Sequence, residues 1–138
     1  MKPPFLTYIS PKTLDEAVSL LDQDSQDSRI LAGGQSLMTM LNMRLIRPRI
    51  LIDIKNINMM NNITVTDEGL SIGANVTQQE LLEYKDLSST SPLLYKVLPW
   101  VGHYQTRTKG TISVSCTHLR AHETLRYLVC RLLLEKKK

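Results

Sequence analysis

The first half of the chain alternates short apolar runs with amphipathic stretches. Residues 5–9 are largely apolar and end at Ser10-Pro11, which predicts a short edge strand. Thr13 follows with Glu16 three residues later, a capping box, and apolar positions then recur at helical spacing from Leu14. Two further apolar runs, residues 29–32 and 50–54, predict buried strands. Residues 36–43, which lie between them, predict a second helix.

The second half begins with two runs of period-2 alternation. Residues 63–66 and 70–73 are joined by Asp67-Glu68-Gly69, which predicts a hairpin with glycine in the turn. Thr77 and Glu80 form a second capping box and predict another helix start. A further helix is expected over residues 93–101, ended by Gly102, and a last strand over residues 110–112.

The expected order is therefore β-α-β-α-β-β-β-α-α-β. Early strands that alternate with helices are typical of a small parallel α/β unit, here with a meander added. The chain has no apolar run of the roughly 18 to 20 residues that a membrane span needs. The N-terminus lacks the apolar core of a secretory signal, so we expect a cytoplasmic protein.

The net charge of +4 is confined to one end of the chain. Residues 1–113 hold eleven Lys or Arg and eleven Asp or Glu, which cancel, whereas residues 114–138 hold six and two. A basic chain would otherwise suggest nucleic-acid binding. Here the excess positive charge lies in a C-terminal tail and not on a binding face, so no nucleic-acid partner is expected.

The segment with the clearest chemistry runs from Leu31 to Leu37, with the sequence LAGGQSL. A strand that ends in Gly33-Gly34 and feeds a helix favours anion binding, because glycine lets a ligand approach the backbone and the helix start offers unpaired N–H groups. Ser36 adds a hydroxyl donor. The alternative is a tight β-to-α turn without a ligand. Neither the Gly-x-Gly-x-x-Gly fingerprint nor a Walker loop is present.

Several motifs in the right order resemble the p-cresol-methylhydroxylase-type FAD domain over about residues 5–112. The nearest branch is the flavin (medium) subunit of molybdenum hydroxylases such as carbon monoxide, xanthine and nicotinate dehydrogenases. The motifs are Tyr8-x-x-Pro11, the segments Leu14–Leu21 and Leu31–Leu37, Arg44-Leu45-x-x-Pro48, Leu51–Ile54, Ile72-Gly73-Ala74-x-x-Thr77, and Val101-Gly102-His103-x-Gln105-x-Arg107-x-x-Gly110-Thr111-Ile112.

The resemblance implies the first subdomain and the start of the second subdomain of a two-part FAD domain. It implies that electrons from a molybdopterin subunit pass through iron–sulfur clusters on a second partner subunit to FAD. FAD then passes them to an external acceptor. No acid/base pair is expected in this chain. The implied FAD-binding residues are Leu31, Ala32, Gly33, Gly34, Gln35, Ser36 and Leu37 in a first loop, Ile72, Gly73, Ala74 and Thr77 beside the hairpin, and Arg107, Gly110, Thr111 and Ile112 in a second loop.

Other family-typical residues have plainer interpretations. His103 suits either a hydrogen bond at a helix end or contact with the flavin. Arg44 and Asp53 suit a structural ion pair.

The family pattern stops at Ile112. The second loop of the family continues with a Gly-Gly pair, where this chain has Ser113-Val114, and Thr108 replaces an asparagine. We therefore expect residues 1–112 to be a partial FAD-binding domain, inactive alone, and residues 113–138 to be a basic, non-native tail that resembles translated adapter sequence. In that tail Cys116, His118 and His122 are too few for a metal site, so none is expected.

Two other functions stay open at this point. The glycine loop suits a non-enzymatic α/β module that binds another phosphate-containing ligand. The fold also occurs in flavin oxidases, which often attach flavin through a histidine near the first loop. Residues 1–102 contain no histidine, which argues against that attachment.

Overall fold

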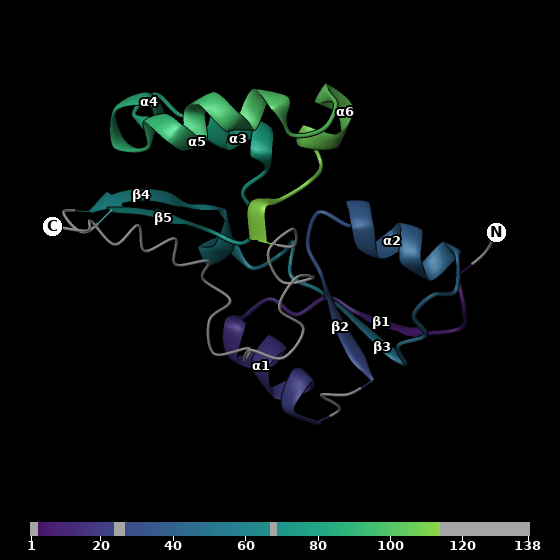
Figure 1. The fold of residues 1–138 in the computed structure, drawn as a ribbon. Helices are drawn as coiled ribbons and strands as arrows, with labels where there is room; N and C mark the ends of the chain where they lie inside the picture. Colours follow the sequence, from purple (N-terminus) through teal and green to yellow (C-terminus); the bar gives the residue numbers. More distant parts are fainter. Residues whose placement is uncertain (1–2, 24–26, 67–68, 114–138) are drawn as a thin grey trace, which may run out of the picture.

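The computed structural model of the chain describes residues 3–23, 27–66 and 69–113, which include a parallel sheet and a separate hairpin (Figure 1). The three strands of the sheet lie in the order β1-β3-β2, and both pairings are parallel. Tyr8 lies opposite Leu51, and Leu31 lies opposite Asp53. The strands are β1 (Thr7–Ile9), β2 (Ser28–Leu31) and β3 (Ile50–Asp53).

One helix covers each face of this sheet. Helix α1 (Leu14–Gln23) buries Ala17 and Leu21 in a core that also contains Ile52. Helix α2 (Gln35–Asn42) buries its apolar side against Leu51. Since successive strand residues point to opposite faces, neighbouring positions of β3 serve the two helices. The sequence folds this way because β3 is apolar at both alternating positions.

The rest of the described chain forms a hairpin and a layer of short helices above it (Figure 1). Strands β4 (Ile63–Thr66) and β5 (Gly69–Ile72) pair antiparallel, after the 3₁₀ turn η1 (Asn58–Asn61). The layer consists of α3 (Gln78–Leu82), α4 (Leu87–Thr90), α5 (Pro92–Val97), η2 (Leu98–Trp100) and α6 (Tyr104–Arg107). Its core holds Ile72, Val76, Leu81, Leu87 and Leu98.

The expected α/β class, the parallel unit and the hairpin are confirmed. The expected strand at residues 110–112 is wrong: Thr111 makes only an isolated bridge to Thr77, and helical geometry begins at residue 112. The expected helix over residues 93–101 instead starts at Pro92 and tightens into η2, which contains Pro99. Within the described ranges, no helix is long and apolar enough to cross a membrane.

Candidate functional site

Helix α2 begins without a side-chain cap. Its N-cap residue is Gly34, whose φ of 72° is left-handed, and no side chain caps the amides of the first turn. In the described part of the chain, the first amide of this helix with a backbone acceptor is that of Met38, which donates to Gly34 O at 3.0 Å. The preceding amides and the positive end of the helix dipole are therefore available to an anion.

A second loop packs directly against this helix start. A Cβ on Gly33 would lie 2.4 Å from Lys109 O and 2.7 Å from Thr111 N, so only glycine fits there. A Cβ on Gly110 would lie 3.6 Å from Gln35 Cγ. The structure therefore brings together the two glycine-containing loops that the sequence resemblance selects. In Figure 1 the end of the described chain, in yellow-green, lies between the upper helices and α2.

The segment before α3 holds the second loop from its other side. The amide of Gln78 donates to Gly110 O at 2.9 Å, and Thr77 pairs with Thr111 in the isolated bridge. The Ser113 hydroxyl donates to Ala74 O at 2.8 Å. Two segments far apart in sequence, residues 33–35 and 74–78, thus pack against the loop of residues 110–113.

The side chain of Thr77 is already used by the fold. Its hydroxyl accepts from the Glu80 amide at 3.2 Å, and Glu80 Oε2 accepts from the Thr77 amide at 2.8 Å. The capping box expected from the sequence is confirmed. The capping groups at the start of α3 therefore bond to each other and are not available to a ligand.

Other expected FAD-binding residues have side chains in the hydrophobic cores. Leu37, Ile72 and Ala74 are buried in three different clusters. A Cβ on Gly73 would lie 2.2 Å from Met60 O, so this glycine allows the hairpin to approach η1. Any contact of these residues with a ligand would have to use the backbone.

Arg107 holds the turn that precedes α6. Its Nη1 donates to Pro99 O at 3.0 Å and to Gly102 O at 2.9 Å. The guanidinium therefore ties the end of η2 to α6. His103 is exposed at the N-cap position of α6, and its side chain makes no capping bond.

Asp53 lies at the carboxyl edge of the sheet, opposite Leu31. Its carboxylate accepts from the Tyr8 hydroxyl and, at 2.9 Å, from the Lys55 amide. The hydrogen bond to Asp53, followed by desolvation and the charge of that carboxylate, raises the pKa of Tyr8. The ion pair considered for Arg44 and Asp53 is not among the contacts of the described residues, and Arg44 is exposed with a φ of 56°.

Gln78 is a residue of this region that sequence reasoning missed. Its side chain is buried, and its Oε1 has no hydrogen-bond partner within the described residues. The sequence gives no sign of this, because two glutamines after an N-cap are typical of a solvated first turn. The local pattern does not show that the second loop packs on this residue, whose amide donates to Gly110 O and whose Nε2 would lie 3.8 Å from a Cβ on Gly110.

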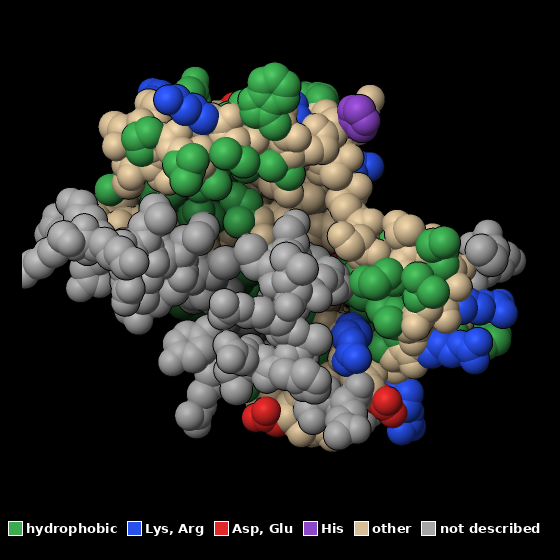
Figure 2. Space-filling model, viewed as in Figure 1, with side chains coloured by type: hydrophobic (Ala, Val, Ile, Leu, Met, Phe, Trp, Pro, Cys, Tyr) green, Lys and Arg blue, Asp and Glu red, His purple; other side chains and the backbone are tan. Residues whose placement is uncertain are grey.

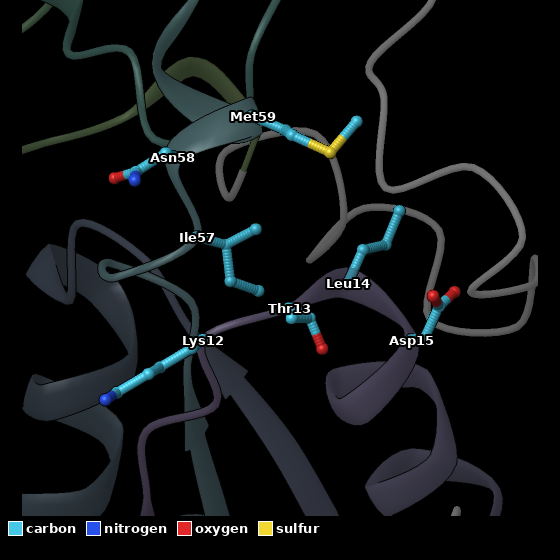
Figure 3. A pocket seen from close by; sticks show the side chains of 7 residues that line it. All are labelled: Lys12, Thr13, Leu14, Asp15, Ile57, Asn58 and Met59. Atoms are coloured by element: carbon cyan, nitrogen blue, oxygen red, sulfur yellow. The ribbon is translucent and has the colours of Figure 1, made fainter.

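A separate pocket of about 390 Å³ lies between the start of α1 and η1 (Figure 3). It contains none of the glycine-loop residues. Figure 3 shows Lys12 and Asp15 extending to opposite sides, so their charges do not converge on a ligand. Within the described ranges, no group of three or more His, Cys, Asp or Glu could hold a metal ion, and the Cys116–His122 segment lies outside them.

The family model described as "FAD binding domain in molybdopterin dehydrogenase" matches residues 4–121. This range passes Ile112, and the domain boundary expected there stays a prediction.

Two curated relatives are similar over most of the chain. The 6-hydroxypseudooxynicotine dehydrogenase complex subunit alpha of Paenarthrobacter nicotinovorans is 37% identical over 88% of this chain and 41% of its own length. The carbon monoxide dehydrogenase medium chain of Hydrogenophaga pseudoflava is 35% identical over 86% and 41%. The chain thus spans about two fifths of the length of these relatives.

The fold also resembles solved structures. A chain of quinoline 2-oxidoreductase from Pseudomonas putida 86 superposes with a TM-score of 0.82 at 36% identity. The match covers 93% of this chain and 45% of that one.

Proposed function

Because the chain belongs to the family of FAD-binding domains of molybdopterin dehydrogenases, we propose that its two glycine loops hold the diphosphate of FAD. The observation that carries this proposal is the uncapped start of α2, against which Gly33 packs the second loop. Helix-start amides bind phosphate oxygens well because both their N–H groups and the helix dipole favour negative charge.

The residues present fit a dinucleotide with an anionic centre. The amides at the start of α2 lack a cap, and the close contact at Gly33 keeps side chains out of the junction. The exposed hydroxyl of Ser36 lies in the first turn and adds a donor. The Ser113 hydroxyl is turned to Ala74 O, so this residue, which departs from the family pattern, is held by the protein itself.

We further propose that the parent protein is the flavin subunit of a molybdenum-hydroxylase-type oxidoreductase, assembled with an iron–sulfur subunit and a molybdopterin subunit in the cytoplasm. The bound flavin would supply electron transfer from the iron–sulfur clusters to an external acceptor. The role of this chain is to bind and orient that cofactor, and none of its residues is assigned to acid/base catalysis.

Exposed apolar surface supports an assembly. Figure 2 shows apolar side chains gathered over the upper helices and over α2. Leu93 is 70% exposed and Trp100 is 87% exposed, both in the upper layer. Large apolar side chains concentrated on a surface are typical of protein interfaces.

Titration of the purified 138-residue chain with FAD tests the proposed cofactor. FAD should raise the thermal midpoint, and its flavin fluorescence should change on binding, with a Kd in the micromolar range. ATP and coenzyme A are the comparison ligands. Protection by either of them without protection by FAD would favour a module that binds another phosphate-containing ligand and would refute the FAD proposal.

A further inference from the structure

Gln78 is the first residue of α3 and has a polar side chain that the fold itself does not use. It is 6% exposed, and its Oε1 is buried without a donor in the described part of the chain. Its backbone amide donates to Gly110 O. A buried amide oxygen without a hydrogen bond is costly, so its retention calls for a partner that the described residues do not supply.

The position of this amide relates it to both glycine loops. A Cβ on Gly110 would lie 3.8 Å from Gln78 Nε2 and 3.6 Å from Gln35 Cγ. The Gln78 amide therefore lies beside Gly110 on the side where α2 begins. This is the helix start that has no cap.

The other residues with a buried polar atom that lacks a partner differ from Gln78 in their hydrogen bonds or in their position. Gln79 has its Nε2 on Glu83 Oε1 at 2.7 Å, and Arg107 donates through Nη1 to two carbonyls. Ser28 lies at the amino end of β2, the sheet edge opposite the glycine loop. Among the described residues, Gln78 alone combines an unpartnered amide oxygen with a position at the junction of the two loops.

The hydrogen-bonding chemistry of Gln78 Oε1 indicates which group of a ligand can bind to it. An amide oxygen only accepts hydrogen bonds, and the oxygens of an ionised diphosphate only accept as well. A phosphate therefore cannot satisfy Oε1, whereas a sugar hydroxyl can donate to it. In FAD, hydroxyl-bearing sugar or polyol groups flank the diphosphate on both sides.

We propose that Gln78 is an FAD-binding residue whose side-chain oxygen accepts a hydrogen bond from a cofactor hydroxyl next to the diphosphate. This inference rests on the proposed function, and it adds a residue that separates FAD from a bare anion. The helix start recognises charge, and Gln78 recognises the sugar attached to it.

The test compares the 138-residue chain with Gln78→Met, which keeps the length of the side chain and removes both the acceptor Oε1 and the donor Nε2. FAD should bind about tenfold more weakly, which corresponds to about 1.4 kcal/mol. Inorganic diphosphate, titrated by calorimetry, should bind equally well to both proteins. Without ligand, the variant should unfold at the same or a higher temperature, because an unsatisfied buried group has been removed. Gln23→Met, at the exposed end of α1, is the matched control and should change none of these quantities.

The outcomes separate this inference from the proposed function. If the unmodified chain binds FAD and Gln78→Met binds it equally well, the inference fails and the proposed function stands. If the unmodified chain does not bind FAD, both fail. A variant that loses stability without ligand and loses FAD and diphosphate to the same extent would show that Gln78 is a structural residue, which also overturns the inference.

Discussion

Helices α3 and α2 begin in opposite ways. At the start of α3, Thr77 and Glu80 bond to each other's amides, so the first turn is satisfied from within. At the start of α2, Gly34 provides no side chain and the first turn has no cap. Helix α1 resembles α3, since Thr13 Oγ1 accepts from the Glu16 amide at 3.3 Å and Glu16 Oε2 from the Lys12 amide at 3.1 Å.

The difference separates stability from binding. At a capped helix start, the capping side chains and the backbone amides stabilise the fold by bonding to each other, so they cannot bind a ligand. Groups of an uncapped start contribute less to the fold and remain available to an anion. A substitution at α3 should therefore change the free energy of unfolding, whereas one at α2 should change FAD affinity. The junction that joins the two regions should affect both.

The largest effect is expected for Gly33→Ala at that junction. The new Cβ would lie 2.4 Å from the backbone oxygen of Lys109, which has little freedom to move. Forcing the loops apart should cost about 3 kcal/mol of unfolding free energy and abolish measurable FAD binding. Urea denaturation and FAD titration measure the two quantities.

Gly69→Ala is the control for this junction. Gly69 has a φ of 146° in the hairpin turn, so backbone strain alone should lower the stability, at a residue that is not expected to contact FAD. At a temperature where this variant is folded, FAD should still bind. If Gly33→Ala also binds FAD normally when folded, the contact between the loops is not part of the cofactor site.

The next largest effect is expected for Thr77→Ala, which removes the cap of α3. The loss of one capping side chain should lower the unfolding free energy by about 1 kcal/mol. FAD affinity should change by less than twofold, because the Thr77 hydroxyl bonds within the chain. Thr77→Ser keeps the capping oxygen and should recover most of the stability. A large loss of FAD affinity in Thr77→Ala would contradict the separation of the two helix starts.

The opposite pattern is expected for Ser36→Ala in the first turn of α2. Ser36 is exposed, and its hydroxyl makes no hydrogen bond within the described residues. The unfolding free energy should therefore stay within a few tenths of a kcal/mol. FAD should bind roughly fivefold more weakly, since a neutral hydrogen bond contributes about 1 kcal/mol. Calorimetry with FAD checks the affinity, and an unchanged Kd would remove Ser36 from the site.

Sequence patterns predicted the capped helix starts because their signals are local. A capping box spans four residues, and the one at Thr77 and Glu80 is confirmed. At α1 only half of the expected box forms, because Thr13 accepts from the Glu16 amide while Glu16 accepts from the Lys12 amide instead of that of Thr13. The parallel sheet followed from apolar runs alternating with helices. The short elements η1, α4 and α6 were not predicted, because single turns of helix depend on their packing more than on their own residues.

The junction itself was only partly predictable. The resemblance placed residues from both loops in one site. The contact of Gly33 with Lys109 and Thr111 joins residues far apart in the sequence, so no local pattern predicts it. Gln78 was missed for the same reason, since its contact with Gly110 joins residues far apart in the chain. Arg107, which the resemblance placed in the second loop, bonds through Nη1 to two backbone carbonyls, and its contact with FAD stays a prediction.

The smallest effect concerns Asp53, a carboxylate at the sheet edge from which the glycine loop begins, and its partner Tyr8. The hydrogen bond to Asp53 raises the pKa of Tyr8 in the folded chain above its unfolded value of about 10. The stabilisation is therefore present below pH 10 and is lost as the pH rises through the folded pKa, because only the unfolded chain releases the proton at first. The unfolding free energy, measured in urea from pH 8 to pH 11, should fall less steeply above pH 10 in Tyr8→Phe. Asp53→Asn removes the main cause of the shift and should flatten the profile in the same direction. Equal slopes in all three proteins would mean that the hydrogen bond between Tyr8 and Asp53 does not stabilise the edge of the sheet.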